Sequence, residues 1–161
     1  MPASGKNIGE SSTITVRRMF ASDVPSVLSI LRESPEASIW SEENLLESAC
    51  RGLAWTAELN GHLAGILIGR VAADEFEILN LAVGKECRRR GVATKLVGAA
   101  VESVGMEGAR QSYLEVRASN EGAIALYAGM GFRVCGRRPN YYSHPTEDAV
   151  LLVLHRNSTN L

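Results

Sequence analysis

Residues 88–93, Arg-Arg-Arg-Gly-Val-Ala, join a predicted strand that ends at Val83 to a predicted helix that begins at Gly91. A helix start presents unpaired backbone N–H groups, and the helix dipole adds partial positive charge there. Gly91 and the small Ala93 let a ligand approach the backbone, and the arginines add fixed charge. The turn is suited to bind a pyrophosphate, although a solvated basic turn explains these six residues equally well. It matches neither the Walker A pattern nor G-x-G-x-x-G, which disfavours nucleotide hydrolysis and dinucleotide redox chemistry.

One carboxylate, Glu115, lies within the strand predicted over Gln111–Arg117. Strand alternation places Tyr113 and Arg117 on the same face as Glu115. A buried carboxylate is costly unless it is paired or takes part in chemistry. The strand by itself favours a structural ion pair between Glu115 and Arg117, and a general base is the alternative.

Three other side chains have types that can do chemistry. Glu77 lies on the predicted strand Glu75–Val83, and Tyr127 lies on a predicted helix, where an isolated tyrosine usually belongs to the core. Cys87 has no base near it in the sequence. A nucleophilic cysteine needs an activating partner, so we disfavour a covalent Cys/His mechanism.

Alternating helices and strands must position these residues. The predicted strands are Thr13–Met19, Ala54–Leu59, His62–Val71, Glu75–Val83, Gln111–Arg117, Phe132–Arg137 and Ala149–His155, and the predicted helices are Asp23–Glu33, Ser41–Cys50, Gly91–Gly105 and Glu121–Gly129. Asp23 and Ser41 are expected N-caps, Asn60-Gly61 a hairpin turn and Gly105 a helix stop. The strand-helix-strand order predicts parallel pairing around residues 79 and 114, within an α/β fold with a mixed sheet.

Length and composition restrict the class of protein. The chain has 161 residues, 45% hydrophobic and 22% charged, which is typical of one globular domain, and we expect this domain over residues 13–156 after a disordered tail at 1–12. A formal net charge of −1 gives no basic excess for nucleic acid, and the longest apolar run, six residues, is too short to cross a membrane. Three widely spaced cysteines disfavour disulfides and structural zinc and fit the cytoplasm.

Beyond these physical patterns, the sequence resembles the GNAT superfamily of N-acetyltransferases. The strand-turn-helix with Arg-x-x-Gly-x-Ala is similar to the coenzyme A motif of that superfamily. The stretch from Tyr113 to Phe132, YLEVRASNEGAIALYAGMGF, resembles its RimI branch, the ribosomal-protein alanine N-acetyltransferases, as do RRPNYY at 137–142, EDA at 147–149 and IWS at 39–41. The resemblance covers residues 13–155. It implies the GNAT fold, a mostly antiparallel sheet of about seven strands with a splayed parallel pair and about four helices.

The resemblance also implies where acetyl-coenzyme A binds. The backbone of Leu81, Ala82 and Val83 pairs with the pantetheine arm in the manner of an added strand. The turn residues Arg89, Arg90, Gly91, Val92, Ala93 and Thr94 hold the pyrophosphate, and the superfamily uses no metal. Asn120 reaches the cofactor near its pantetheine, and it is equally an N-cap for the next helix. Ala93 stands where many members have glycine, a permitted variant.

For the reaction, the resemblance implies a base and an acid. The family's base falls on Glu115, which reverses the preference for a structural pair, and Glu77 is the alternative base. Tyr127 matches the family's general acid. In the RimI branch the acceptor is the N-terminal alanine of ribosomal protein S18. The resemblance places Trp40, Tyr141 and Tyr142 on the substrate side. We expect the two tyrosines in a loop between the last two strands. We expect a monomer or a weak dimer.

Two other functions remain open at this stage. The chain is expected to acetylate a protein N-terminus, and an acetyltransferase of the same fold for a small amine or a protein lysine is the first alternative. A catalytically silent domain that binds coenzyme A is the second. The presence of Glu115 and Tyr127 disfavours a catalytically silent domain, and the RRPNYY segment at 137–142 favours a peptide acceptor.

Overall fold

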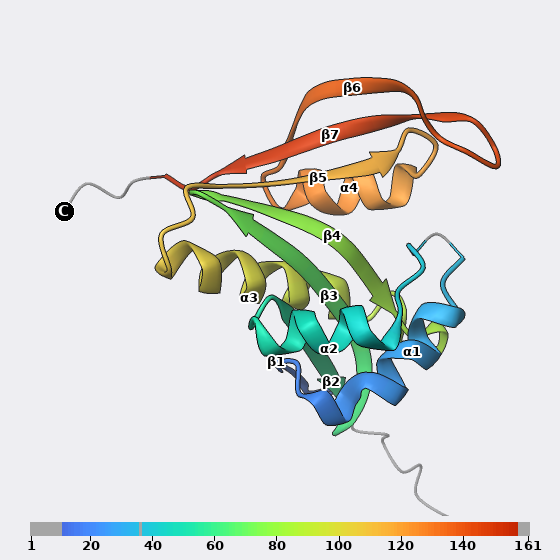
Figure 1. The fold of residues 1–161 in the computed structure, drawn as a ribbon, viewed down its shortest axis with the longest axis vertical. Coiled ribbons are helices and arrows are strands. Elements are labelled where there is room, and N and C mark those ends of the chain that lie inside the picture. Colours follow the sequence, from blue (N-terminus) through green and yellow to red (C-terminus); the bar gives the residue numbers. More distant parts are fainter. Residues whose placement is uncertain (1–10, 36, 158–161) are drawn as a thin grey trace, which may run out of the picture.

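The computed structural model describes residues 11–35 and 37–157, where four α-helices cover a seven-stranded sheet (Figure 1). Its elements are β1 (Ile14–Arg18), η1 (Ala21–Asp23), α1 (Val24–Arg32), α2 (Glu42–Cys50), β2 (Ala54–Leu59), β3 (His62–Ala72), β4 (Glu75–Val83), η2 (Lys85–Cys87), α3 (Val92–Met106), β5 (Gln111–Arg117), α4 (Glu121–Gly129), β6 (Arg133–Tyr142) and β7 (Glu147–His155). The expected tail at 1–12 lies outside the described residues except for Ser11 and Ser12. No helix in these ranges is long and apolar enough to cross a membrane.

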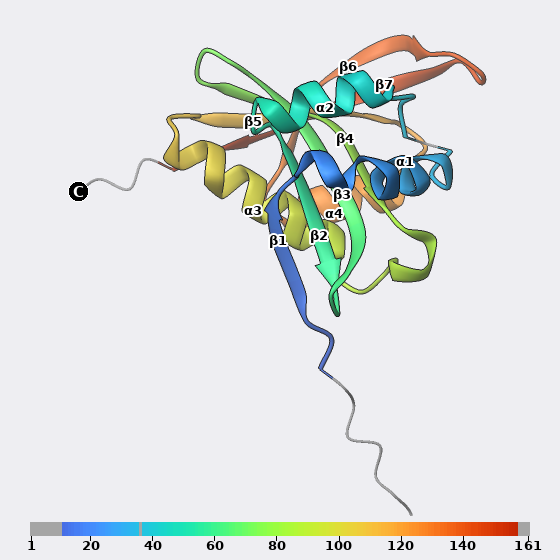
Figure 2. The same cartoon turned by 60° about the horizontal axis from the view of Figure 1, so that its bottom comes forward.

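The helices divide between the two faces of the sheet and enclose two cores. Helices α1 and α2 pack on one face, around Val27, Leu45 and Ile66. Helices α3 and α4 cover the other face, where Leu96, Leu114 and Tyr127 are buried (Figures 1 and 2). The strand order is β1-β2-β3-β4-β5-β7-β6, with every neighbouring pair antiparallel except β4 and β5. This confirms the mixed, mostly antiparallel sheet.

Several local predictions are confirmed at the residue level. The bounds of β2, β4, β5 and α4 are those expected from the sequence. Asn60 and Gly61 form the β2–β3 turn with φ of 52° and 83°, the left-handed backbone that a two-residue hairpin requires. Ser41 caps α2 because its hydroxyl accepts a hydrogen bond from the Asn44 N–H at 3.1 Å.

Two helix-end predictions differ from the structure. Asp23 is the N-cap residue of α1, as predicted, but its side chain makes no cap bond to the helix. It accepts instead from the Phe20 N–H and from Arg17, so it closes η1 before the helix begins. Gly105 does not stop α3, which continues to Met106, and the left-handed backbone comes at Gly108, with φ of 110°. At Gly105 a Cβ would lie 2.2 Å from Arg156 Nη1, so a larger residue there would require the flexible Arg156 side chain to move.

The sixth strand is longer than predicted. It runs to Tyr142, so Tyr141 and Tyr142 belong to β6 and not to a loop. Arg138 pairs with Ala149 and Tyr142 pairs with Glu147, which leaves three residues of β6 opposite the single residue 148. This bulge contains Asn140, whose backbone has φ of 51° and whose N–H donates to Asp148 Oδ1 at 2.9 Å. Bulges of this kind turn side chains out of the regular alternation.

The parallel strands β4 and β5 separate half-way along. Their pairing runs from Glu75–Gln111 to Ile78–Leu114 and stops there, and the two strands then diverge (Figure 1). At the same point Ile68 and Gly69 of β3 pair with Asn80 and Ile78, so Leu79 is an extra residue on β4. This bulge reverses the alternation. Ile78 lies in the core under α3, whereas Ala82 lies in the core under α1.

Candidate active site

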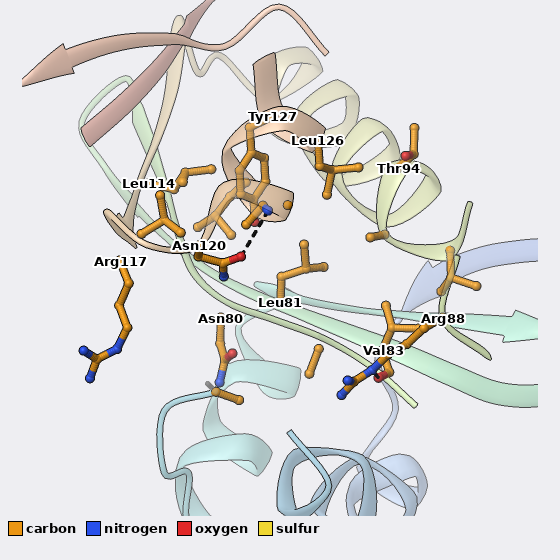
Figure 3. Close-up of a pocket in the computed structure, with 18 of the residues that line it drawn as sticks. Asn80, Leu81, Val83, Arg88, Thr94, Leu114, Arg117, Asn120, Leu126 and Tyr127 are labelled. Atoms are coloured by element: carbon orange, nitrogen blue, oxygen red, sulfur yellow. Dashed lines mark hydrogen bonds between the residues drawn. The ribbon is translucent and has the colours of Figure 1, made fainter. Parts of the chain in front are cut away.

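A cavity of about 1010 Å³ opens where β4 and β5 separate (Figure 3). Beyond Ile78 the side of β4 that faces the gap has no strand partner. The predicted pantetheine residues Leu81, Ala82 and Val83 line this side, while their other side pairs with β3. The geometry therefore offers an extended ligand a strand edge along which it can form backbone hydrogen bonds.

The basic turn closes one end of the cavity. Arg89, Gly91, Val92, Ala93 and Thr94 all line it, whereas Arg90 does not. Gly91 is the N-cap of α3 with φ of 87°, and it offers no side-chain cap to the free N–H groups of the first helical turn. These N–H groups and the dipole of a 15-residue helix make an anion site that suits a pyrophosphate.

Arg88, the first arginine of the basic turn, also lines the cavity, although the predicted pyrophosphate residues began at Arg89. Its Nε donates to the Val83 carbonyl at 3.2 Å, and its Nη2 lies 3.4 Å from Ser34 Oγ. Arg88 therefore connects the turn to the end of β4 and to the segment that follows α1.

Asn120 and Tyr127 enter the cavity from α4. Asn120 is the N-cap of this helix, because its Oδ1 accepts from the Ala123 N–H at 3.1 Å, and its side chain lines the cavity (Figure 3). Tyr127 is 6% exposed and packs edge-on against Phe132, with 5.6 Å between ring centroids. Burial raises the pKa of Tyr127 to about 12, so its hydroxyl keeps its proton through the neutral range.

Glu115 lines the cavity from β5, with its side chain 14% exposed. The expected ion pair with Arg117 is absent. Instead, Arg138 Nε donates to Glu115 Oε1 at 2.7 Å, and the Tyr141 hydroxyl hydrogen-bonds to the same carboxylate, which raises the pKa of Tyr141. Both partners come from the start and end of the β6 bulge. The bulge thus aims two donors at this carboxylate from a strand that is not adjacent to β5.

Arg117 faces the β6–β7 hairpin. It pairs with Glu147 at 3.2 Å and donates to the carbonyls of Ser143 and Pro145. Its guanidinium carbon lies 4.5 Å from the Tyr142 ring centroid, and in Figure 3 its side chain extends away from Tyr127.

Four of the predicted residues lie outside the cavity lining, namely Arg90, Glu77, Trp40 and Tyr141. Glu77 lies on the paired part of β4, beside Tyr113, and forms an ion pair with Arg70. Trp40 packs against the core under α1 and α2, with its indole N–H buried and without a partner among the described residues. Tyr141 is 53% exposed and approaches the site only through Glu115.

Three residues have contacts at the site that the sequence did not predict, namely Arg138, Arg117 and Asn80. Asn80 lines the cavity and donates to the Ser38 carbonyl at 3.4 Å, which joins β4 to the α1–α2 connection. Strand alternation alone places Asn80 under α3 with Ile78, and only the extra residue at Leu79 turns it to the other face. Within the described ranges, no cluster of His, Cys, Asp or Glu side chains is arranged to hold a metal ion.

Comparison with known proteins decides the family. The model of the acetyltransferase (GNAT) family matches residues 18–132, which is more than half of the chain. The chain belongs to the GNAT family. It is therefore an N-acetyltransferase that uses acetyl-coenzyme A.

Individual relatives place this acetyltransferase near one branch of the family. It is 33% identical over 145 residues to the [ribosomal protein bS18]-alanine N-acetyltransferase of Escherichia coli K12, covering 87% of this chain and 96% of the relative. A putative enzyme of the same description from Bacillus subtilis 168 is 34% identical over 141 residues, covering 85% and 92%. The crystal structure of the E. coli enzyme superimposes with a TM-score of 0.77 at 30% identity, over 92% of this chain and 99% of that one.

An archaeal structure shares the same fold. The structure of Ard1 from Thermoplasma volcanium superimposes with a TM-score of 0.79 at 26% identity, covering 88% of this chain and 97% of that one. The resemblance to the GNAT superfamily and to its RimI branch is thus confirmed.

Proposed function

We propose that this acetyltransferase acetylates the N-terminal α-amine of a protein that begins with alanine, and that ribosomal protein S18 is its acceptor. The observation that carries the proposal is the 33% identity to the bS18-alanine enzyme, which extends over 96% of that relative. The cavity supports it, because it is lined on one side by Tyr127 and on the other by Glu115 and Tyr142. Cofactor and acceptor can therefore approach each other through the gap in the sheet.

In this proposal the cofactor lies along β4. The backbone of Leu81, Ala82 and Val83 pairs with the pantetheine arm, and the turn from Arg89 to Thr94 holds the pyrophosphate. Asn120 reaches the pantetheine with the amide donors that its capping bond leaves available. The thioester is then held at the gap between Tyr127 and Glu115.

The chemical step is a direct attack of the acceptor amine on the thioester. Glu115, acting through a water molecule, takes a proton from the ammonium, and the neutral nitrogen forms a bond to the acetyl carbon. The carbon–sulfur bond breaks, and Tyr127 gives its proton to the departing thiolate. The nitrogen, now bonded to the acetyl carbon, loses its second proton to water, and a proton from water restores the Tyr127 phenol. The high pKa of Tyr127 supports this assignment, because the phenol is protonated when the thiolate leaves.

Mass spectrometry of acetylated peptides tests the proposal. The enzyme and acetyl-coenzyme A are incubated with the N-terminal peptide of S18, the same peptide with a blocked N-terminus and internal lysines, and a free polyamine. We expect one acetyl group on the unblocked alanine peptide. Acetylation only of lysine or of polyamine would replace the proposal with the small-amine or lysine alternative, and binding of coenzyme A without any transfer would indicate a silent domain.

A further inference from the structure

The tip of the β6–β7 hairpin has little backbone pairing of its own. After the Arg138–Ala149 pair the ladder is interrupted, and Tyr142–Glu147 is the single pair that closes the hairpin. The segment from Tyr142 to Glu147 therefore depends on other contacts for its position.

Arg117, at the end of β5, supplies most of these contacts. Nη1 donates to the Pro145 carbonyl at 3.1 Å and to Glu147 Oε1 at 3.2 Å, and Nη2 donates to the Ser143 carbonyl at 3.0 Å. The guanidinium also lies over the Tyr142 ring, at 4.5 Å from its centroid. One planar fork thus holds two carbonyls, a carboxylate and an aromatic ring, a combination that the point charge of lysine cannot reproduce.

The carboxylate of Glu147 is held from a second side. The Ser119 N–H donates to Glu147 Oε2 at 2.8 Å. Hydrogen bonds from Ser119, and next from Arg117, keep the pKa of Glu147 below its ordinary value. The side chains of Arg117 and Glu147 are only 29% and 18% exposed, so the contact is sheltered from water.

The contacts of Arg117 with residues 142–147 form a tether, and this tether holds one wall of the cavity. Tyr142 lines the cavity together with Arg117 and Glu115, on the face opposite Tyr127. Tyr142 stacks edge-on with Tyr141, at 5.1 Å between ring centroids, and Tyr141 reaches Glu115. Movement of the hairpin tip would therefore shift this wall, whereas the bond from Arg138 at 2.7 Å would still hold the Glu115 carboxylate.

We propose that Arg117 is the positioning residue for the acceptor: it fixes the hairpin tip, and with it Tyr142, as the preformed wall against which the acceptor binds. The proposal rests on the proposed function, because it assigns this face of the cavity to the acceptor. Because this wall is ordered before the acceptor binds, binding does not carry the entropic cost of ordering the hairpin tip. Loss of Arg117 therefore weakens acceptor binding and leaves cofactor binding in place.

The test compares Arg117→Met with Arg137→Met. Both variants exchange an arginine of this region for methionine. Arg137, however, pairs with Asp148, at 3.2 Å, and among the described residues it forms no ion pair with the tip. For Arg117→Met we expect about a tenfold rise in the KM for the acceptor, the scale of losing one ordered contact. The kcat and the calorimetric Kd for acetyl-coenzyme A should stay near those of the wild type. Arg117→Lys should remain closer to Arg117→Met than to the wild type, and Arg137→Met should behave as the wild type.

Hydrogen–deuterium exchange supplies a readout that needs no acceptor. In Arg117→Met, the amides of Tyr142 and Glu147, the pair that closes the hairpin, should exchange faster while those of β5 and of residues 149–155 stay protected. Unchanged exchange would overturn the tether, and faster exchange with an unchanged KM would overturn the role in acceptor binding. If Arg117→Met does not fold, Glu147→Gln weakens the same contact more mildly and takes its place.

The two proposals can fail separately. If the wild type acetylates a lysine or a small amine and no N-terminal peptide, the proposed function fails. The KM for that acceptor then replaces the KM for the peptide in the same comparison, and the exchange experiment is unaffected.

Discussion

Glu115 connects the β6 bulge to the cavity, because its carboxylate lines the cavity and accepts from Arg138 and Tyr141. We predict that Glu115→Gln lowers kcat by about 10²- to 10⁴-fold, the usual effect of removing a positioned base. Glutamine keeps the size of the side chain and its capacity to accept a hydrogen bond but cannot take the proton. Steady-state kinetics should therefore show the loss in kcat, and calorimetry should show unchanged affinity for acetyl-coenzyme A.

Glu77→Gln is the matched control for this experiment. Glu77 lies on the neighbouring strand, pairs with Arg70 and does not line the cavity. We expect this variant to keep most of its activity. An inactive Glu77→Gln beside an active Glu115→Gln would show that the base is Glu77.

Tyr127→Phe removes a single hydroxyl from the other side of the cavity. We predict that kcat falls by about 10²- to 10⁴-fold while KM changes little, because the proton is needed only as the thiolate leaves. Since the pKa of Tyr127 is about 12, its titration should not cause a fall in kcat at ordinary alkaline pH. A pH profile of kcat measures this directly. Tyr113→Phe, outside the cavity lining, is the control.

At the scale of elements, local sequence patterns were sufficient for much of the fold. The bounds of β4 and β5 were predicted from the sequence, and the side chains of both strands alternate in burial. Asn60-Gly61 predicts the β2–β3 turn because both residues adopt the left-handed backbone that this turn needs. These signals are local, so no tertiary contact is needed to recognise them. The basic turn was indicated as an anion site by its own residues, with a solvated turn as the alternative. The site residues on β4 were placed by resemblance to a family, which carries tertiary information that periodicity lacks.

The orientation or the partner of some residues depends on strand register, and the sequence analysis did not predict these. The apolar alternation of β4 changes phase at Ile78 and Leu79, two adjacent apolar residues followed by Asn80. Only the register with β3 shows that this change is a bulge that turns Asn80 to the other face. The partner of Glu115 is 23 residues away on a strand two places along the sheet, and identifying it requires the order β5-β7-β6. Arg117 was the nearer candidate, yet it pairs with Glu147 across the hairpin instead.

The start of α3 gives a prediction at this scale. Gly91→Val should weaken acetyl-coenzyme A binding by at least about tenfold, because valine disfavours the φ of 87° and tilts the first N–H groups of the helix. Gly108→Val is the matched control, since Gly108 has φ of 110°, a Cβ there meets no atom within 4 Å, and it does not line the cavity. Both variants should lose similar stability, and only the first should lose affinity in a calorimetric titration. Equal affinities would remove the turn from the binding site.

The whole molecule depends on how its N-terminal elements join the sheet, because β1 is an edge strand and α1 must cover the core beside it. Arg17 of β1 makes this junction. It binds Asp23 through both carboxylate oxygens, at 2.7 and 3.0 Å, and Glu58 of β2 at 3.0 Å. Asp23 also accepts from the Phe20 N–H at 2.7 Å. One carboxylate therefore links the edge of the sheet to the segment that leads into α1.

This junction makes stability depend on pH in a definite direction. The hydrogen bond from Arg17 lowers the pKa of Asp23 below its ordinary 3.8, so the folded protein binds this proton less readily than the unfolded chain. The stabilisation is complete above about pH 4 and is lost as the pH falls through the folded pKa. Asp23→Asn should thus cost about 1–2 kcal/mol at neutral pH, and its difference from the wild type should shrink below pH 4. Urea unfolding at several pH values measures both.

The exposed pair between Asp74 and Arg110, 3.6 Å apart, provides the control. Because both side chains are largely in water, Asp74→Asn should change the unfolding free energy by no more than about 0–1 kcal/mol. If Asp23→Asn and the wild type differ by the same amount at pH 7 and at pH 3, the charge of Asp23 is not what secures the junction. The loss would then have a cause other than the titration of Asp23, because asparagine can still accept the hydrogen bond from the Phe20 N–H.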